Sequence, residues 1–155
     1  MAAPFDVNAL QESLVLPFPA ATKQVAGLVN GVQTDVMTMS FSDKIMVTIS
    51  QAGRLAHWLH VPMENLNPGT EGMHTMPEGE DNLLPFKNLT STTLLGGHSP
   101  GQDTTGQLLA RQIATAIATK TPSESRLLVV GLGLGQATAD RDAFFAIVDL
   151  VLQCI

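Results

Sequence analysis

The sequence is poor in the residues that build covalent or metal-held frameworks. Its 155 residues include one cysteine, Cys154, which excludes a disulfide framework and favours a reducing compartment. We interpret Cys154 as a small core residue of a helix. The histidines form no ligand cluster, because His57 and His60 would lie on opposite faces of a strand and the other two are isolated. We therefore expect no metal site and no cofactor.

Positive charge is also scarce. Eight Lys and Arg residues are scattered along the chain against fourteen acids, giving a net charge of −6. Because no basic stripe exists, nucleic acid is not expected as a partner. Many of the acids lie in one Pro- and Gly-rich segment without a basic residue, which predicts a flexible acidic loop over residues 63–86. These acids are Glu64, Glu71, Glu78, Glu80 and Asp81.

Long apolar runs and targeting signals are absent as well. No run approaches the length that spans a bilayer, and the first residues lack the basic and apolar regions of a secretory signal. Three prolines and little periodicity predict a flexible leader over residues 1–19. We expect one domain over residues 1–155, located in the cytoplasm, with the nucleus as a second compartment.

What the sequence does contain is a series of short strands separated by turn residues. Asn30-Gly31 is a strong two-residue hairpin signal, because both positions must accept positive φ. Ser42-Asp43 and Ala52-Gly53 mark the next two reversals. We predict an antiparallel meander of four strands, followed by a fifth strand and by a sixth that is apolar on both sides and therefore central. The predicted strands cover residues 25–29, 32–41, 44–50, 55–61, 88–95 and 126–130.

Two segments in the second half have the helical period. The first is predicted from a cap at Asp103 or Thr104 to Thr119, with its polar side formed by Arg111, Gln112 and Thr115. The second is predicted from residue 138 to the end of the sequence. The element order predicts an α+β fold, in which a six-stranded antiparallel sheet begins with the meander and carries two helices on one face.

The strands give the two faces of this sheet different characters. Ile45, Val47 and Ile49 point to one face, whereas their neighbours point to the other. The second face mixes Met, Thr, Val and Ser with almost no Lys or Glu, and is either half of an interface or a Thr-rich solvent face. Its methionines fit core filling or adaptable packing against a partner. We predict a dimer interface here, formed by Met37, Met39, Met46, Thr48, Ser50 and Trp58.

Two motifs are similar to catalytic sequences but lack essential parts. Gly97-His98-Ser99-Pro100-Gly101 matches the G-x-S-x-G elbow, yet Pro100 has no N–H for an oxyanion and no histidine follows His98. Gly131-x-Gly133-x-Gly135 follows a strand, but its register fails the dinucleotide fingerprint and no later strand can supply the ribose acid. These motifs predict no catalytic residues. The glycines are expected to let a neighbouring backbone approach closely.

Several segments together form a recognisable pattern: residues 31–36, 41–42 and 45–53 of the early strands, Thr93-Leu94-Leu95-Gly96, and the strand and helix from Leu127 to Ile155. In these segments the chain resembles the proteasome assembly chaperone 3 family. It covers two blocks, 22–62 and 88–155. The acidic insertion and the proline-rich leader depart from compact members and are typical of a fungal form.

The resemblance implies a non-enzymatic chaperone of proteasome assembly. It implies pairing with the fourth proteasome assembly chaperone and binding of α subunits while the α-ring of the 20S proteasome forms. We also expect a homodimer when the chain is purified alone, which exchanges to the heterodimer. Two other classes stay open on the residues alone. One is a dimeric scaffold module of the roadblock or longin type, and the other is a small nucleotide-binding protein.

Overall fold

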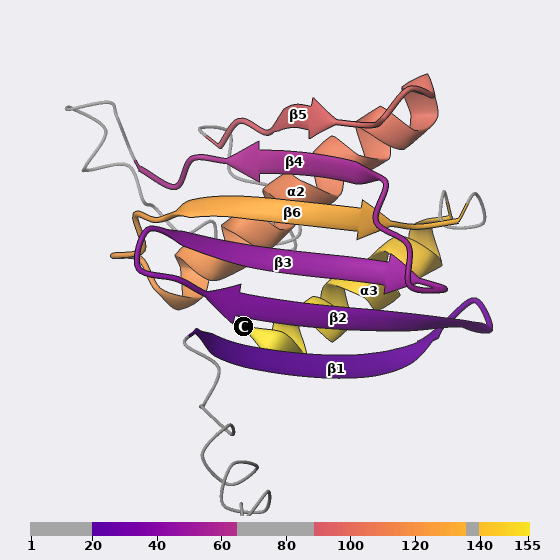
Figure 1. The fold of residues 1–155 in the computed structure, drawn as a ribbon, viewed down its shortest axis with the longest axis horizontal. Coiled ribbons are helices and arrows are strands. Elements are labelled where there is room, and N and C mark those ends of the chain that lie inside the picture. Colours follow the sequence, from indigo (N-terminus) through magenta and orange to yellow (C-terminus); the bar gives the residue numbers. More distant parts are fainter. Residues whose placement is uncertain (1–19, 65–88, 136–139) are drawn as a thin grey trace, which may run out of the picture.

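The protein is described by a computed structural model over residues 20–64, 89–135 and 140–155. This part of the chain forms six strands and two helices, and Figure 1 shows how they are arranged. The leader predicted over residues 1–19 and nearly all of the acidic loop predicted over 63–86 lie outside the described residues. The elements are β1 (Ala21–Val29), β2 (Val32–Ser40), β3 (Lys44–Gln51), β4 (His57–Val61), β5 (Thr92–Leu95), α2 (Pro100–Lys120), β6 (Leu127–Gly133) and α3 (Arg141–Cys154).

The six strands form one sheet in the order β1-β2-β3-β6-β4-β5. The predicted α+β class is confirmed, and the predicted sixth strand is central. The predicted four-strand meander was wrong at its fourth member, because β6 lies between β3 and β4 and pairs with β3 in parallel. All other neighbouring strands are antiparallel. A strand that is apolar on both faces buries the most apolar surface in the middle of a sheet. This accounts for the insertion of β6 between β3 and β4.

The turns between the first strands have the backbone conformation that the sequence predicts. Asn30 and Gly31 have φ values of 50° and 75°, so they join β1 to β2 as a two-residue hairpin. Ala52 and Gly53, with φ values of 55° and 67°, reverse the chain after β3. Asn30 and Ala52 are the non-glycine residues with positive φ in the described ranges.

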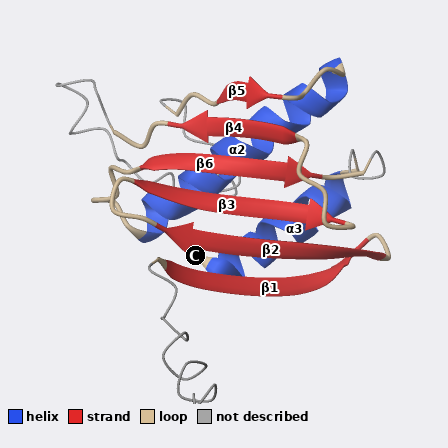
Figure 2. Cartoon of the chain, in the orientation of Figure 1, coloured by secondary structure: helices blue, strands red, loops and turns tan. Residues whose placement is uncertain are grey.

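Both helices cover the same face of the sheet, which is the far face in Figure 2. Helix α3 packs on β1 and β2, whereas α2 packs on β4, β5 and β6, and the two helices touch each other. Between them and the sheet lies the core, where side chains such as Ile49, Leu59 and Ile113 are almost completely buried. Branched aliphatic residues from five strands and two helices fill this space, and their burial drives folding.

Helix α2 differs from its prediction in two ways. It begins at Pro100 with Ser99 as N-cap, one turn before the predicted cap, because proline suits the first position of a helix. Gln112 and Thr115 were predicted to face outward, but both are buried. The helix contacts three strands and α3, so its buried surface is wider than one apolar stripe. None of the helices within the described ranges is long and apolar enough to cross a membrane.

Candidate functional site

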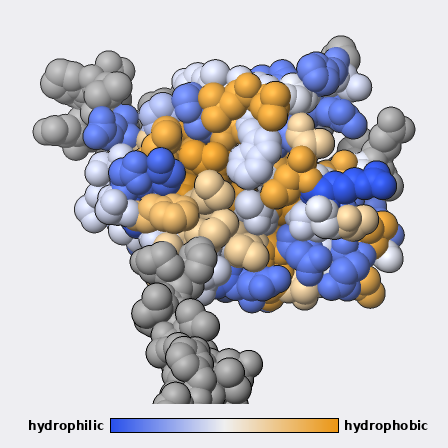
Figure 3. Space-filling model, in the orientation of Figure 1, coloured by the Kyte–Doolittle hydropathy of each residue, from blue (hydrophilic) through white to orange (hydrophobic). Residues whose placement is uncertain are grey.

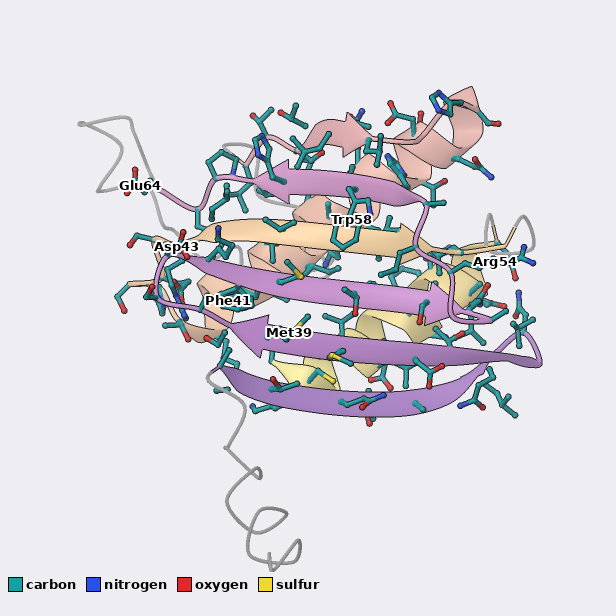
Figure 4. All side chains as sticks on the ribbon, in the orientation of Figure 1. Met39, Phe41, Asp43, Arg54, Trp58 and Glu64 are labelled. Carbon is teal, nitrogen blue, oxygen red and sulfur yellow. The ribbon has the colours of Figure 1, made fainter. Side chains whose placement is uncertain are left out.

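The face of the sheet opposite the helices is the candidate functional site, and we call it the open face. Strand register places every residue of the predicted interface on it, since Met37 pairs with Thr48 and Met39 with Met46. These side chains are half-buried, and no described helix covers them. Figure 3 shows apolar patches across this face, and Figure 4 shows Met39 and Trp58 on it. The open face includes Met37, Met39, Met46, Thr48, Ser50, Trp58, His60 and Val129.

The indole of Trp58 lies against the backbone of β6. A Cβ atom at Gly131 would come within 2.8 Å of Trp58 Cζ3 and Cη2, so the missing side chain makes room for the ring. Trp58 pairs with Gly131 on one side and with Leu95 of β5 on the other. Its position was predicted from the sequence, but its dependence on Gly131 was not. A tryptophan held flat on a surface presents a large apolar area at little entropic cost, as in many interface hot spots.

The apolar surface continues to the β5 end of the sheet. Leu95 pairs with Trp58 on the open face and is 65% exposed. The three methionines of the open face do not belong to the core cluster, so the interpretation of core filling was wrong. Their alternative interpretation, adaptable packing at a surface, fits their half-buried position.

The covered face holds a polar cluster that sequence reasoning missed. His57 Nε2 lies 3.3 Å from Thr93 Oγ1 and 3.4 Å from Asp103 Oδ1. Thr93 and Gln107 donate hydrogen bonds to the same carboxylate at 2.6 and 2.8 Å. Gly97 and Gly106 make room for the imidazole, because a Cβ atom at either would lie within 3 Å of it. Residues distant in the sequence meet here, so the spacing gave no signal.

Burial lowers the pKa of His57, and the nearby Asp103 carboxylate only partly opposes this effect. His57 is therefore favoured in its neutral form. Hydrogen bonds within the cluster join β4, β5 and α2. The cluster therefore has a structural role, which is to hold these three elements together. His60 lies on the other face of β4, as the odd spacing predicts.

The two catalytic-like motifs have structural roles. The carbonyl of Ser99 accepts hydrogen bonds from the N–H groups of Gln102 and Asp103, so Ser99 is the N-cap of α2. Gly133 packs against the Arg54 carbonyl, which would lie 1.4 Å from a Cβ atom at this position. This confirms the predicted close backbone approach. The N–H of Gly135 donates to Gln51 Oε1 at 2.9 Å, so it binds the protein itself and not a phosphate.

Cys154 is 1% exposed, and its Sγ donates to the Val36 carbonyl at 3.7 Å. Burial raises the pKa of this thiol, which fits the predicted core residue. Among the described residues, no group of three or more His, Cys, Asp or Glu side chains could hold a metal ion.

Helices on one face and a half-buried, largely uncharged surface on the other define a class of protein that acts through protein–protein contacts. The comparisons place the chain within this class. The model of the family "Proteasome assembly chaperone 3" matches residues 47–154, which is more than half of the chain. The chain belongs to this family, and its role is that of a proteasome assembly chaperone.

One similar solved structure is the crystal structure of a chaperone complex for yeast 20S proteasome assembly. The match covers 84% of this chain and 98% of that chain, with 14% sequence identity and a TM-score of 0.53. At this identity the likeness shows a shared fold. A comparison with curated protein sequences finds no match.

Proposed function

We propose that this chain is a non-enzymatic subunit of a heterodimer that binds α subunits while the α-ring of the 20S proteasome forms. Its partner is a paralogous chaperone, the fourth of the assembly chaperones. Family membership supports the role in assembly. The structural relative is itself part of a chaperone complex for proteasome assembly, which supports a chaperone partner.

The open face is the observation that carries this proposal. Met37, Met39 and Met46 adapt to an irregular partner surface because their side chains are unbranched and flexible. Trp58 and Leu95 add a rigid apolar area beside them. A sheet of the partner can pack on this face about 10 Å away, as in other sheet-on-sheet interfaces.

The polar residues on the open face determine which part of it a partner can bury. Asp35, opposite Ser50, is the acid of this face within β2 and β3, and its neighbours Thr48 and Ser50 are short and neutral. A partner can therefore bury the centre of the face without leaving a charge unpaired, which would be costly. Asp35 is then expected near the rim of the interface, where water remains.

Affinity purification of the full chain, read by mass spectrometry, tests the proposal. We expect the paralogous chaperone and proteasome α subunits to be recovered with the wild-type protein. The variant Met39→Glu should lose the paralogue, because it would bury an unpaired charge in the contact. Leu152→Glu is the matched control, since Leu152 is 48% exposed on α3 and lies away from the open face. Recovery of the paralogue with both variants would contradict the proposal.

A further inference from the structure

Strand β5 is held to the sheet by few backbone contacts. It has four residues and lies at one edge, so β4 is its neighbour within the described sheet. Its pairing with β4 is interrupted by a register shift next to Trp58. Edge segments with few ladder hydrogen bonds are among the first parts of a fold to open locally. The position of β5 therefore depends on its side chains.

Thr93 of β5 connects this strand to both β4 and α2. Its Oγ1 donates to Asp103 Oδ1 at 2.6 Å and lies 3.3 Å from His57 Nε2. A hydroxyl has one proton, which Thr93 gives to the carboxylate, so the same oxygen accepts the N–H of the imidazole. Gln107 donates to the other carboxylate oxygen at 2.8 Å, which fixes the direction of the carboxylate. One hydroxyl thus ties β5 to a strand and to a helix.

The open face lies directly behind this cluster. Trp58 follows the histidine of the cluster in β4, and Leu95 of β5 pairs with it. Thr93 and Leu95 are two positions apart, so they would share one face of a regular strand. Their partners in β4 are adjacent, however, which leaves Leu94 as an extra residue and turns Leu95 to the open face. The place of Leu95 beside the indole therefore depends on this irregularity.

Both ends of the irregular part of β5 are fixed. At one end, Thr93 is held by its two hydrogen bonds. At the other end, Gly96 packs on β4, because a Cβ atom at this position would lie 2.0 Å from the Ala56 carbonyl oxygen. Gly97 then covers the cluster, since a Cβ atom there would lie 2.7 Å from the imidazole. Leu95 lies between these fixed points.

We propose that the hydroxyl of Thr93 is a positioning group for partner binding, together with the side chains of His57 and Asp103. From the covered face they hold Leu95 beside Trp58, so that the apolar surface of the open face extends to the edge of the sheet. The proposal rests on the proposed function, in which the paralogous chaperone packs on this face. Apolar groups that are already in place lose less conformational entropy when a partner binds.

Replacing the hydroxyl of Thr93 with a methyl group tests this role in the full chain. Thr93→Val keeps the shape and the strand preference of the side chain but removes one donor from the Asp103 carboxylate. In the isolated chain we expect the amides of β5 to exchange hydrogen about tenfold faster. The affinity for the paralogous chaperone, measured by titration calorimetry, should fall by about tenfold. Thr93→Ser, which keeps the hydroxyl, should stay within about threefold of the wild type in both measurements.

Two further variants complete the test. Thr119→Val is the matched control, because it removes a threonine hydroxyl that donates to the Thr115 carbonyl within α2, and it should leave the affinity unchanged. Asp103→Asn keeps the shape of the acceptor but removes its charge, so it should weaken binding by about threefold or more. This variant carries the test if Thr93→Val fails to fold.

A purely structural role would lower stability and leave the affinity of the folded chain unchanged. The proposal is therefore overturned if folded Thr93→Val or folded Asp103→Asn binds the paralogue like the wild type, or if Thr93→Ser binds as weakly as Thr93→Val. Met39→Glu separates this failure from a failure of the proposed function. If Met39→Glu loses the paralogue while folded Thr93→Val keeps it, the positioning role alone is wrong. If Met39→Glu binds normally, the partner does not use the open face, and both proposals are wrong.

Discussion

The two faces of this sheet are made by the same strands, yet they carry different functions. On the covered face, Val47, Ile49 and Leu59 are completely buried against the helices. On the open face, the residues next to them in sequence, such as Met46, Thr48 and Trp58, are half-buried. Because side chains alternate, one strand can supply stability on one side and a binding surface on the other. Substitutions should separate these two properties.

The largest expected effect on stability is in the covered core. Leu59→Ala should lower the free energy of unfolding by about 2–5 kcal/mol, because it leaves a cavity in a site with no exposure. Met46→Ala changes a half-buried side chain on the open face of β3, so it should lower the free energy of unfolding by less than about 1 kcal/mol. Urea denaturation measures both. Equal losses would mean that the open face is as important for folding as the core.

Two glycines of β6 extend the comparison. Gly133→Ala would force a Cβ atom into the Arg54 carbonyl, and both groups belong to the backbone, so we expect a loss of about 3 kcal/mol. Gly131→Ala meets only the ring of Trp58, which can move, so its cost should be below about 1 kcal/mol. The second variant should instead shift tryptophan fluorescence. Thermal unfolding and emission spectra distinguish the two, and the reverse order of stabilities would contradict the packing described.

A third effect on stability comes from an ion pair at the end of the strands, which lies on neither face of the sheet. Arg126 donates to both carboxylate oxygens of Glu124 and also to Ser40 Oγ and the Phe41 carbonyl, which ties β6 to the turn after β2. The hydrogen bonds from Arg126 lower the pKa of Glu124 from 4.5 to about 2. Since the folded-state pKa is the lower one, the stabilisation is complete above pH 4.5 and is lost as the pH falls towards 2.

The free energy of unfolding should therefore fall by on the order of 2 kcal/mol over this interval through Glu124 alone. Glu124→Gln should be less stable at neutral pH and should lack this part of the pH dependence. Denaturation curves at several acidic pH values give the comparison. If the free energy of unfolding of the wild type and of Glu124→Gln changed with pH in the same way, Glu124 would not be the source of this pH dependence.

The smallest effect on stability is expected where the effect on binding is largest. Met39→Glu lies on the open face, so the isolated chain should change its free energy of unfolding by less than about 0.5–1 kcal/mol. Binding of the paralogue should nevertheless fall by at least about tenfold, because the buried charge has no partner. Titration calorimetry and urea denaturation on the same preparation separate the two quantities. If Met39→Glu were strongly destabilised but bound the paralogue normally, the open face would serve stability and not binding.

Local signals in the sequence predicted much of the fold. Period-two alternation identified β2 and β3, and Asn30-Gly31 and Ala52-Gly53 identified their turns, because these features depend on neighbouring residues. The insertion of β6 between β3 and β4 could not be predicted in this way, since parallel pairing joins residues far apart in the chain. The apolar character of β6 indicated a central strand but not its neighbours.

The candidate site was predicted in part for the same reason. Alternation grouped Met46, Thr48 and Ser50, and the β2–β3 register added Met37 and Met39. The seat of Trp58 on Gly131 and the cluster around His57 depend on contacts between distant elements. The burial of Gln112 was missed because a single helical stripe does not represent a helix that packs on several elements.

Oxidative footprinting of the methionines tests the central claim most directly. Brief exposure to hydroxyl radicals or peroxide, followed by mass spectrometry, measures how accessible each methionine is. In the isolated chain Met37, Met39 and Met46 should oxidise readily, whereas buried Met63 should react slowly. When the paralogous chaperone is bound, the three methionines of the open face should become protected and Met63 should stay unchanged. Unchanged oxidation of these three residues in the complex would show that the partner binds elsewhere.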